Sequence, residues 1–158
     1  MSLARDIVEI ATQTGRMIAT AESCTGGMVA ATLTDIPGAS AAVERGFVTY
    51  TNGAKTEMLG VRPDTLAAHG AVSEEVAAEM AQGALAHAPV WIAVSITGIA
   101  GPGGSEFKPE GRVCFGIATA HHVATETVEF GARGRSEVRA AARDHALRLL
   151  LDGLRRDP

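Results

Sequence analysis

The sequence predicts an α/β fold, a three-layer α/β/α sandwich built on a mixed, mostly parallel sheet. Helical and strand-like patterns alternate through the first two thirds of the chain, as expected for parallel strands joined by helices. Two further strand-like segments with a tight connection indicate a hairpin, and therefore one antiparallel strand. The 158 residues are 46% hydrophobic and 20% charged, so we expect a single domain over residues 1–158 with a hydrophobic core.

The N-terminal third contains two helical and two strand-like segments. Apolar residues recur at helical spacing from Leu3, which predicts an amphipathic helix that ends near Gly15. The short apolar run at 17–21 predicts a buried strand, and residues 25–33 predict a helix with small residues on one side. The β-rich sequence FVTYT at 47–51 predicts the next strand.

The rest of the chain continues this pattern. Ser73 is a good N-cap, and the two glutamates after it favour a helix that runs to about Ala86. The nearly continuous apolar run at 90–96 predicts the central strand of the sheet, covered on both faces. Residues 112–120 and 123–130 predict the hairpin. We expect Ser136 to cap a long C-terminal helix.

The composition argues against several classes of protein. The net charge of −4 disfavours a nucleic-acid-binding surface, and no apolar run approaches the ~20 residues of a membrane span. The N-terminus lacks the apolar core of a secretory signal, so we expect a cytoplasmic protein. Two cysteines are too few for a disulfide framework. His121 and His122 would face opposite sides of a strand, and no Cys/His cluster exists, so we expect no metal site.

A first candidate site is the segment Ala-Glu-Ser-Cys-Thr-Gly-Gly at 21–27, between a predicted strand and a predicted helix. Ligand sites in open α/β sheets gather at the carboxyl ends of strands, and a helix N-terminus offers free N–H groups. Ser23 could therefore be a nucleophile, with glycines that let a substrate approach the backbone. Alternatively, Ser23 or Thr25 is only an N-cap. Cys24 is a rival nucleophile, although a small buried cysteine is the commoner finding.

Two further segments could complete such a site. The glycine-dense loop at 98–105 can form a nest of backbone N–H groups for a phosphate or an oxyanion, or it is simply a long surface loop. It lacks the Gly-Lys-Ser/Thr ending of an ATP-binding phosphate loop. Lys55, in Tyr-Thr-Asn-Gly-Ala-Lys, could lose its proton in a dry pocket and act as a base, or it is an ordinary solvated charge. Arg133, Arg135 and Arg139 could reach a phosphate or form a solvated basic surface.

Read together, these motifs closely resemble one known family. Their order is AESCTGG, RGFVTYTNGAK, HGAVSE and SITGIAGPGG, and the resemblance covers roughly residues 3–154. It identifies the chain as similar to the C-terminal domain of the competence/damage-inducible protein CinA, in its single-domain form. The resemblance implies a three-layer α/β/α sandwich with a five-stranded mixed sheet. Standalone members are nicotinamide mononucleotide (NMN) amidohydrolases, so the resemblance implies hydrolysis of NMN to nicotinate mononucleotide and ammonia. Amide hydrolysis through a serine requires no metal, and we expect no cofactor.

The resemblance also implies site residues. Ser23 would be the nucleophile, Lys55 its general base, and Thr97 a further catalytic position. Tyr50, Asn52 and Arg135 match further motif positions, and the electrostatic argument above adds the glycine loop and Arg135 as the phosphate site. We therefore expect the following residues to bind substrate: Thr25, Gly26, Gly27, Tyr50, Asn52, Gly98, Gly101, Gly103 and Arg135.

Lys108 follows the glycine loop in the sequence Glu-Phe-Lys-Pro. It would contact the phosphate or only line the rim of the pocket.

Two functions of different classes follow from these expectations. The first is an amidohydrolase of pyridine-nucleotide salvage that acts on NMN through Ser23 and Lys55. The alternative is a non-catalytic pyridine-nucleotide-binding module in a competence or DNA-damage response. We expect no nucleic-acid or membrane partner. We also expect a homo-oligomer, with a dimer as the simplest form.

Overall fold

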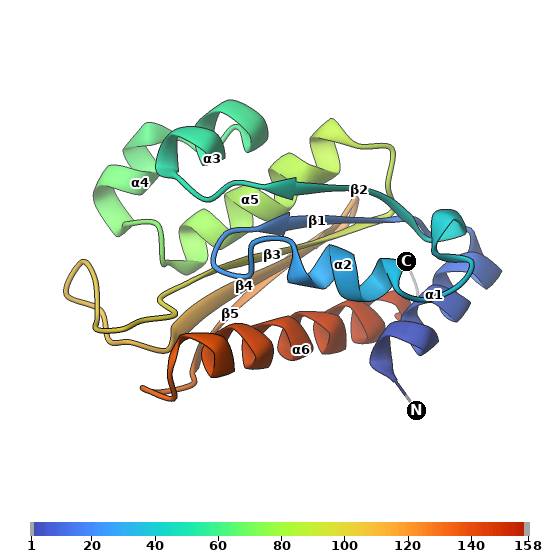
Figure 1. Ribbon diagram of the computed structural model, residues 1–158. Helices are drawn as coiled ribbons and strands as arrows, with labels where there is room; N and C mark the ends of the chain where they lie inside the picture. The colour runs from blue at the N-terminus through green and yellow to red at the C-terminus, as the bar shows by residue number, and fades with distance from the viewer. Residues whose placement is uncertain (1, 157–158) are drawn as a thin grey trace.

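A computed structural model describes residues 2–156, which form one sheet between two layers of helices (Figure 1). One face of the sheet carries three helices, α3 (Asn52–Leu59), α4 (Pro63–His69) and α5 (Glu74–His87). The other face carries α1 (Leu3–Thr14), α2 (Met28–Thr34) and α6 (Arg135–Leu154). A single 3-10 turn, η1 (Ala39–Ala41), leads into the edge of the sheet.

The five-stranded sheet has the order β2-β1-β3-β4-β5. Its strands are β1 (Ile18–Glu22), β2 (Val43–Val48), β3 (Ile92–Gly98), β4 (Arg112–Thr119) and β5 (His122–Glu129). Strand β1 pairs in parallel with both β2 and β3, whereas β4 pairs antiparallel with β3 and β5. Within the described chain only β4 therefore runs against the others. The predicted mixed, mostly parallel α/β/α sandwich is confirmed.

The two central strands are buried because helices cover both faces of the sheet. All five residues of β1 are buried, and so are the first six of β3. This is the pattern of parallel strands that read as continuous apolar runs. In the register, Glu22 lies opposite Val48 on one side and Ile96 on the other, so β1, β2 and β3 end at one edge of the sheet. Segments that follow these strands are brought together there.

The predicted strand at 47–51 is wrong at both ends, because β2 runs over Val43–Val48 and shares only two residues with it. Strand β2 stops at Val48, and the Thr51 hydroxyl accepts a hydrogen bond from the Ala54 N–H at 3.1 Å. Thr51 is thus the N-cap of α3, and side-chain capping outweighs its β propensity here. As a consequence Asn52 and Lys55 lie on a helix.

Other boundaries differ by a few residues for similar reasons. Helix α2 begins at Met28 instead of residue 25, because Gly27 precedes it with a left-handed φ of 106°. Helix α6 begins at Arg135 after Gly134, so Ser136 is not its cap. By contrast, Ser73 caps α5 as predicted, since its hydroxyl accepts from the Val76 N–H at 3.2 Å. Gly98 ends strand β3 instead of opening the loop.

Helix α5 also fixes the position of α3. A Cβ atom at Gly83, in the middle of α5, would lie 1.9 Å from the carbonyl oxygen of Leu59, the last residue of α3. Only a glycine lets the two helices approach this closely. Because α3 carries Lys55, this contact helps to set the position of that side chain.

We predict that Gly83→Ala lowers the free energy of unfolding by about 1–3 kcal/mol, because the new methyl group overpacks the contact with α3. The matched control is Gly53→Ala in α3, where a Cβ meets only the Thr51 hydroxyl oxygen at 3.9 Å. The control should leave stability unchanged or raise it by up to about 1 kcal/mol. Urea unfolding of both variants measures the difference, and equal midpoints would refute the close contact.

Candidate active site

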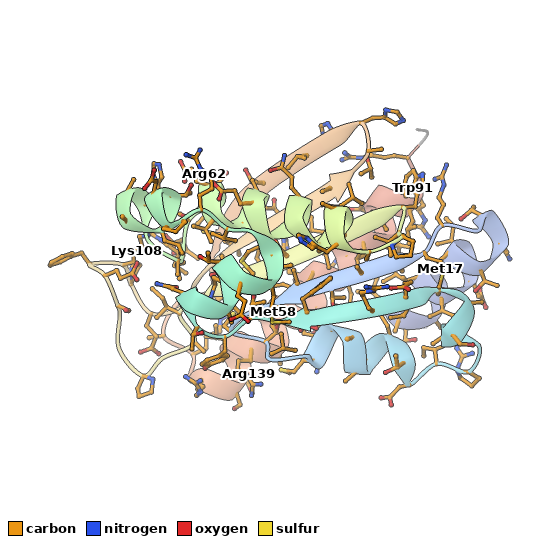
Figure 2. All side chains as sticks on the ribbon, turned by 90° about the horizontal axis from the view of Figure 1, so that it is seen from above. Met17, Met58, Arg62, Trp91, Lys108 and Arg139 are labelled. Atoms are coloured by element: carbon orange, nitrogen blue, oxygen red, sulfur yellow. The ribbon has the colours of Figure 1, made fainter. Side chains whose placement is uncertain are left out.

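A cavity of about 320 Å³ opens at the edge of the sheet where β1 and β3 end. It lies toward the end of the molecule that carries Lys108, whereas Trp91 and Met17 lie at the opposite end (Figure 2). The cavity collects the three segments singled out in the sequence. Its lining residues are Ser23, Cys24, Tyr50, Asn52, Lys55, Ala71, Val72, Thr97, residues 98–106 and Arg135.

The central contact of the cavity joins Ser23 to Lys55. Lys55 Nζ lies 3.0 Å from Ser23 Oγ, and it also donates to the carbonyl oxygens of Thr49 at 3.0 Å and Tyr50 at 3.2 Å. Both side chains are buried, with Ser23 8% and Lys55 1% exposed. Ser23 follows β1 directly and Lys55 lies in the first turns of α3. The fold thus brings a hydroxyl and an amine into hydrogen-bond contact at a site shielded from solvent.

Burial lowers the pKa of the Lys55 amine from its ordinary value, because an ammonium loses its hydration there. The nearby Glu106 carboxylate raises this pKa, but its influence is smaller than that of burial. Within residues 2–156 no carboxylate forms an ion pair with Lys55. An amine that is neutral at moderate pH can accept the proton of the hydroxyl beside it.

Cys24 does not have the character of a nucleophile. Burial raises the pKa of its thiol to about 12, so the thiolate is scarce near neutral pH. Its side chain is 5% exposed, and no histidine lines the cavity. The nearby positive charge of Arg139 lowers the thiol pKa only in part. Of the two candidates in this turn, the hydroxyl of Ser23 is the one paired with a base.

Glu22 is a residue of the site region that the sequence analysis missed. It is fully buried at the end of β1, and its carboxylate accepts from the Thr25 hydroxyl at 2.7 Å. The same carboxylate accepts from the N–H groups of Val29 at 2.9 Å and Ala30 at 3.0 Å. It therefore caps α2 from the strand that precedes it. A carboxylate just before a helix with a glycine at its N-cap is the sequence signal for this role.

Thr25, Gly26 and Gly27 do not line the cavity, although we expected them to bind substrate. The Thr25 hydroxyl is engaged by the Glu22 carboxylate. The two glycines adopt left-handed backbone conformations, with φ of 58° and 106°. Such φ values favour glycine, so these residues are needed to turn the chain between β1 and α2. The alternative that Ser23 or Thr25 is the N-cap is also wrong, since Gly27 occupies that position.

Thr97, Tyr50, Asn52 and Arg135 all reach the cavity. The buried Thr97 hydroxyl donates to the Ala71 carbonyl oxygen at 2.8 Å. The Arg135 guanidinium lies at the start of α6 and links two other segments. It donates to the Tyr50 hydroxyl at 2.6 Å and to the carbonyl oxygen of Gly101 at 2.7 Å. One cation therefore joins α6, the segment before α3 and the glycine loop.

The glycine loop forms one wall of the cavity. Gly98, Gly101 and Gly103 line it, and the last two have left-handed φ values of 93° and 81°. Lys108 is not among the lining residues. Its ammonium donates to the carbonyl oxygens of His69 and Val72, at 2.6 Å each, and so ties the loop to the end of α4.

The other histidines and arginines singled out in the sequence do not line the cavity. His121 lies in the hairpin turn and His122 at the start of β5, and both are exposed. Arg133 is an exposed residue of the loop before α6, whereas Arg139 donates from α6 to the carbonyl oxygens of Cys24 and Thr25.

Over the described range 2–156, no three His, Cys, Asp or Glu side chains are grouped to hold a metal ion. No helix in that range combines the length and apolarity needed to cross a membrane.

Comparisons with known proteins show which family this chain resembles. The family model of the CinA C-terminal domain matches residues 1–154. The nicotinamide-nucleotide amidohydrolase PncC of Escherichia coli K12 is 52% identical over 151 residues, which cover 95% of this chain and 92% of that protein. A CinA-like protein of Chloroherpeton thalassium is 60% identical over 121 residues, which cover 76% of this chain but only 29% of that longer protein.

Solved structures give the same result. The crystal structure of the competence/damage inducible protein CihA from Agrobacterium tumefaciens has a TM-score of 0.93 and 48% identity. The match covers 98% of this chain and 94% of that one. A CinA superfamily protein from Klebsiella pneumoniae 700603 has a TM-score of 0.92 and 37% identity, over 96% of this chain and 95% of that one. The chain therefore belongs to the CinA C-terminal domain family.

Proposed function

We propose that this chain hydrolyses the carboxamide of NMN to nicotinate mononucleotide and ammonia. The observation that carries the proposal is the 3.0 Å contact between Lys55 Nζ and Ser23 Oγ inside a cavity of about 320 Å³. Serine needs an adjacent base to attack an amide, and a desolvated lysine can supply one. The substrate is suggested by the name of the E. coli relative, a nicotinamide-nucleotide amidohydrolase.

In the first half of the reaction the neutral Lys55 amine takes the hydroxyl proton as Ser23 Oγ attacks the carboxamide carbon. The resulting ammonium then gives that proton to the leaving nitrogen, the C–N bond breaks, and ammonia departs. An ester of Ser23 with the nicotinoyl group remains. In the second half Lys55 takes a proton from water, which attacks the ester carbon, and returns it to Ser23 Oγ. Nicotinate mononucleotide is released and the dyad is restored.

Thr97 has a defined hydrogen-bonding capacity in this scheme. Its hydroxyl proton is directed to the Ala71 carbonyl oxygen, so only its lone pairs remain for the cavity. We assign it to accept a hydrogen bond from the carboxamide NH₂ group. That contact would orient the amide so that its carbon faces Ser23 Oγ.

We assign the phosphate of NMN to Arg135 and the glycine loop. Arg135 uses two of its donors on Tyr50 and Gly101, and a guanidinium has five N–H donors in all. The remaining donors can bind a phosphate in bidentate fashion. The backbone N–H groups of a glycine-rich loop are also suited to an anion. Tyr50 and Asn52 also line the cavity and would border the substrate between its carboxamide, at Ser23, and its phosphate, at Arg135.

If Ser23 is the nucleophile and Lys55 its base, Ser23→Ala and Lys55→Met should each lower kcat for NMN by about 10²-fold or more. The usual contribution of a general base is about 10²- to 10⁴-fold. Release of ammonia from purified protein is the measurement, and circular dichroism checks that each variant is folded. Turnover within a few-fold of the unchanged protein in either variant would contradict the mechanism. Binding of NMN without ammonia release from the unchanged protein would favour the binding-module alternative.

The lowered pKa of Lys55 predicts the pH dependence. Lys55 is inactive as an ammonium and active as an amine, so kcat/KM should rise with pH through the Lys55 pKa and then level off. Because burial lowers that pKa, the midpoint of the rise should lie below the ordinary value of ~10.4. A midpoint at or above ~10.4 would count against a desolvated base.

The phosphate assignment predicts a change in substrate preference. Arg135→Gln should raise the KM for NMN by about 10- to 100-fold, because a charge-assisted hydrogen bond contributes about 1.5–3 kcal/mol. The KM for nicotinamide riboside, which lacks the phosphate, should change little. Kinetics with both substrates decide this assignment. An equal loss for the two would mean that Arg135 acts on the ribose, on the ring, or only on the loop.

A further inference from the structure

We propose that Glu22 and Arg139 are the positioning residues of the nucleophile turn, residues 23–27, and set Ser23 against Lys55 before substrate binds. This inference rests on the proposed function, because it assigns a role to two side chains that do not line the cavity. Glu22 accepts hydrogen bonds from the turn and from α2, and Arg139 donates hydrogen bonds to the turn. Together they hold one short segment through both its donors and its acceptors.

Glu22 is a buried charge without a cationic partner. Its exposed fraction is 0%, and the ion pairs within residues 2–156 do not include it. Three donors compensate for its lost hydration: the Thr25 hydroxyl and the N–H groups of Val29 and Ala30, at 2.7–3.0 Å. A buried carboxylate is costly unless its hydrogen bonds are complete. The turn and the start of α2 are therefore locked onto β1.

Arg139 holds the same turn from α6. Its Nε donates to the Cys24 carbonyl oxygen at 3.0 Å, and its Nη2 lies 3.4 Å from the Thr25 carbonyl oxygen. The guanidinium also packs over Gly26, where a Cβ atom would lie 3.4 Å from Nη2. A guanidinium with two fixed donors defines both the distance and the orientation of the turn.

These contacts leave Ser23 little freedom. Its own N–H donates to the Ile96 carbonyl oxygen of β3 at 2.9 Å, so the backbone is fixed on the sheet side. The Glu22 carboxylate holds the Thr25 side chain and the start of α2. Arg139 holds the carbonyl oxygens of Cys24 and Thr25, the two residues that follow Ser23. The remaining variable is the side-chain rotamer, which the contact with Lys55 determines. Misplacement of a reacting group by about 1 Å can cost about 10²-fold in rate.

The role predicts a specific kinetic signature. Neither Glu22 nor Arg139 lines the cavity, so removal of either should leave substrate binding almost unchanged while the chemical step slows. A side chain that only stabilised the fold would lower the unfolding midpoint without changing kcat of the folded protein.

The test compares Arg139→Met with Arg143→Met in the full chain, with NMN as substrate. Arg143 lies one turn further along α6 and pairs with Asp144 at the surface, which makes it a matched control. We expect Arg139→Met to lower kcat by about 10- to 100-fold with KM within about twofold, and Arg143→Met to leave both unchanged. If Arg139→Met does not fold, Arg139→Lys takes its place under the same criterion.

Glu22→Gln is the second variant. The amide keeps the shape of the carboxylate, but its NH₂ group must face one of the N–H groups of Val29 and Ala30, or the Thr25 hydroxyl. We again expect a fall in kcat with KM preserved. Unchanged kcat in folded Arg139 and Glu22 variants would overturn the inference, and so would a rise in KM with kcat intact. Absence of activity in the unchanged protein would instead contradict the proposed function.

Discussion

The burial of one amine is the constraint on which the rest of this structure depends. Lys55 is 1% exposed and makes no ion pair in the described chain, so the fold must compensate for the hydration that it loses. Two carbonyl oxygens and the Ser23 hydroxyl provide its hydrogen bonds. The Thr51 cap and the close contact at Gly83 keep α3 where these bonds can form. Burial of this amine is unfavourable for folding, and the same burial lowers its pKa in the direction that a general base needs.

The sheet explains why four distant segments meet at the cavity that contains this amine. Strands β1, β2 and β3 end at one edge, and the turn with Ser23, the segment before α3 and the glycine loop all start there. Helix α6 adds Arg135, which contacts the other two segments at Tyr50 and Gly101, and Arg139, which contacts the turn. Ligand sites of open α/β sheets occur at such edges. The last helix therefore acts as a support for the site as well as a cover for the sheet.

Sequence reasoning succeeded where a pattern was long or chemically specific. The apolar run of β3, the periodicity of α1 and the Ser73 cap predicted their elements, and the motif residues Ser23 and Lys55 do lie in contact. It failed where two local preferences compete. Thr51 favours a strand by propensity but caps a helix, and the glycines after Ser23 shape a turn instead of lining the cavity. Glu22 escaped notice because its partners, Val29 and Ala30, lie seven and eight residues further on.

The most direct test of the account is the titration of Lys55 itself. The chain contains only two lysines, Lys55 and Lys108, so a protein labelled with ¹³C at the lysine ε-carbon gives two resonances. The Lys108→Arg variant leaves Lys55 alone. We expect this resonance to titrate below ~10.4 and to shift when Ser23 is replaced by alanine. A resonance that titrates at or above ~10.4 would show a solvated ammonium and would contradict the central claim.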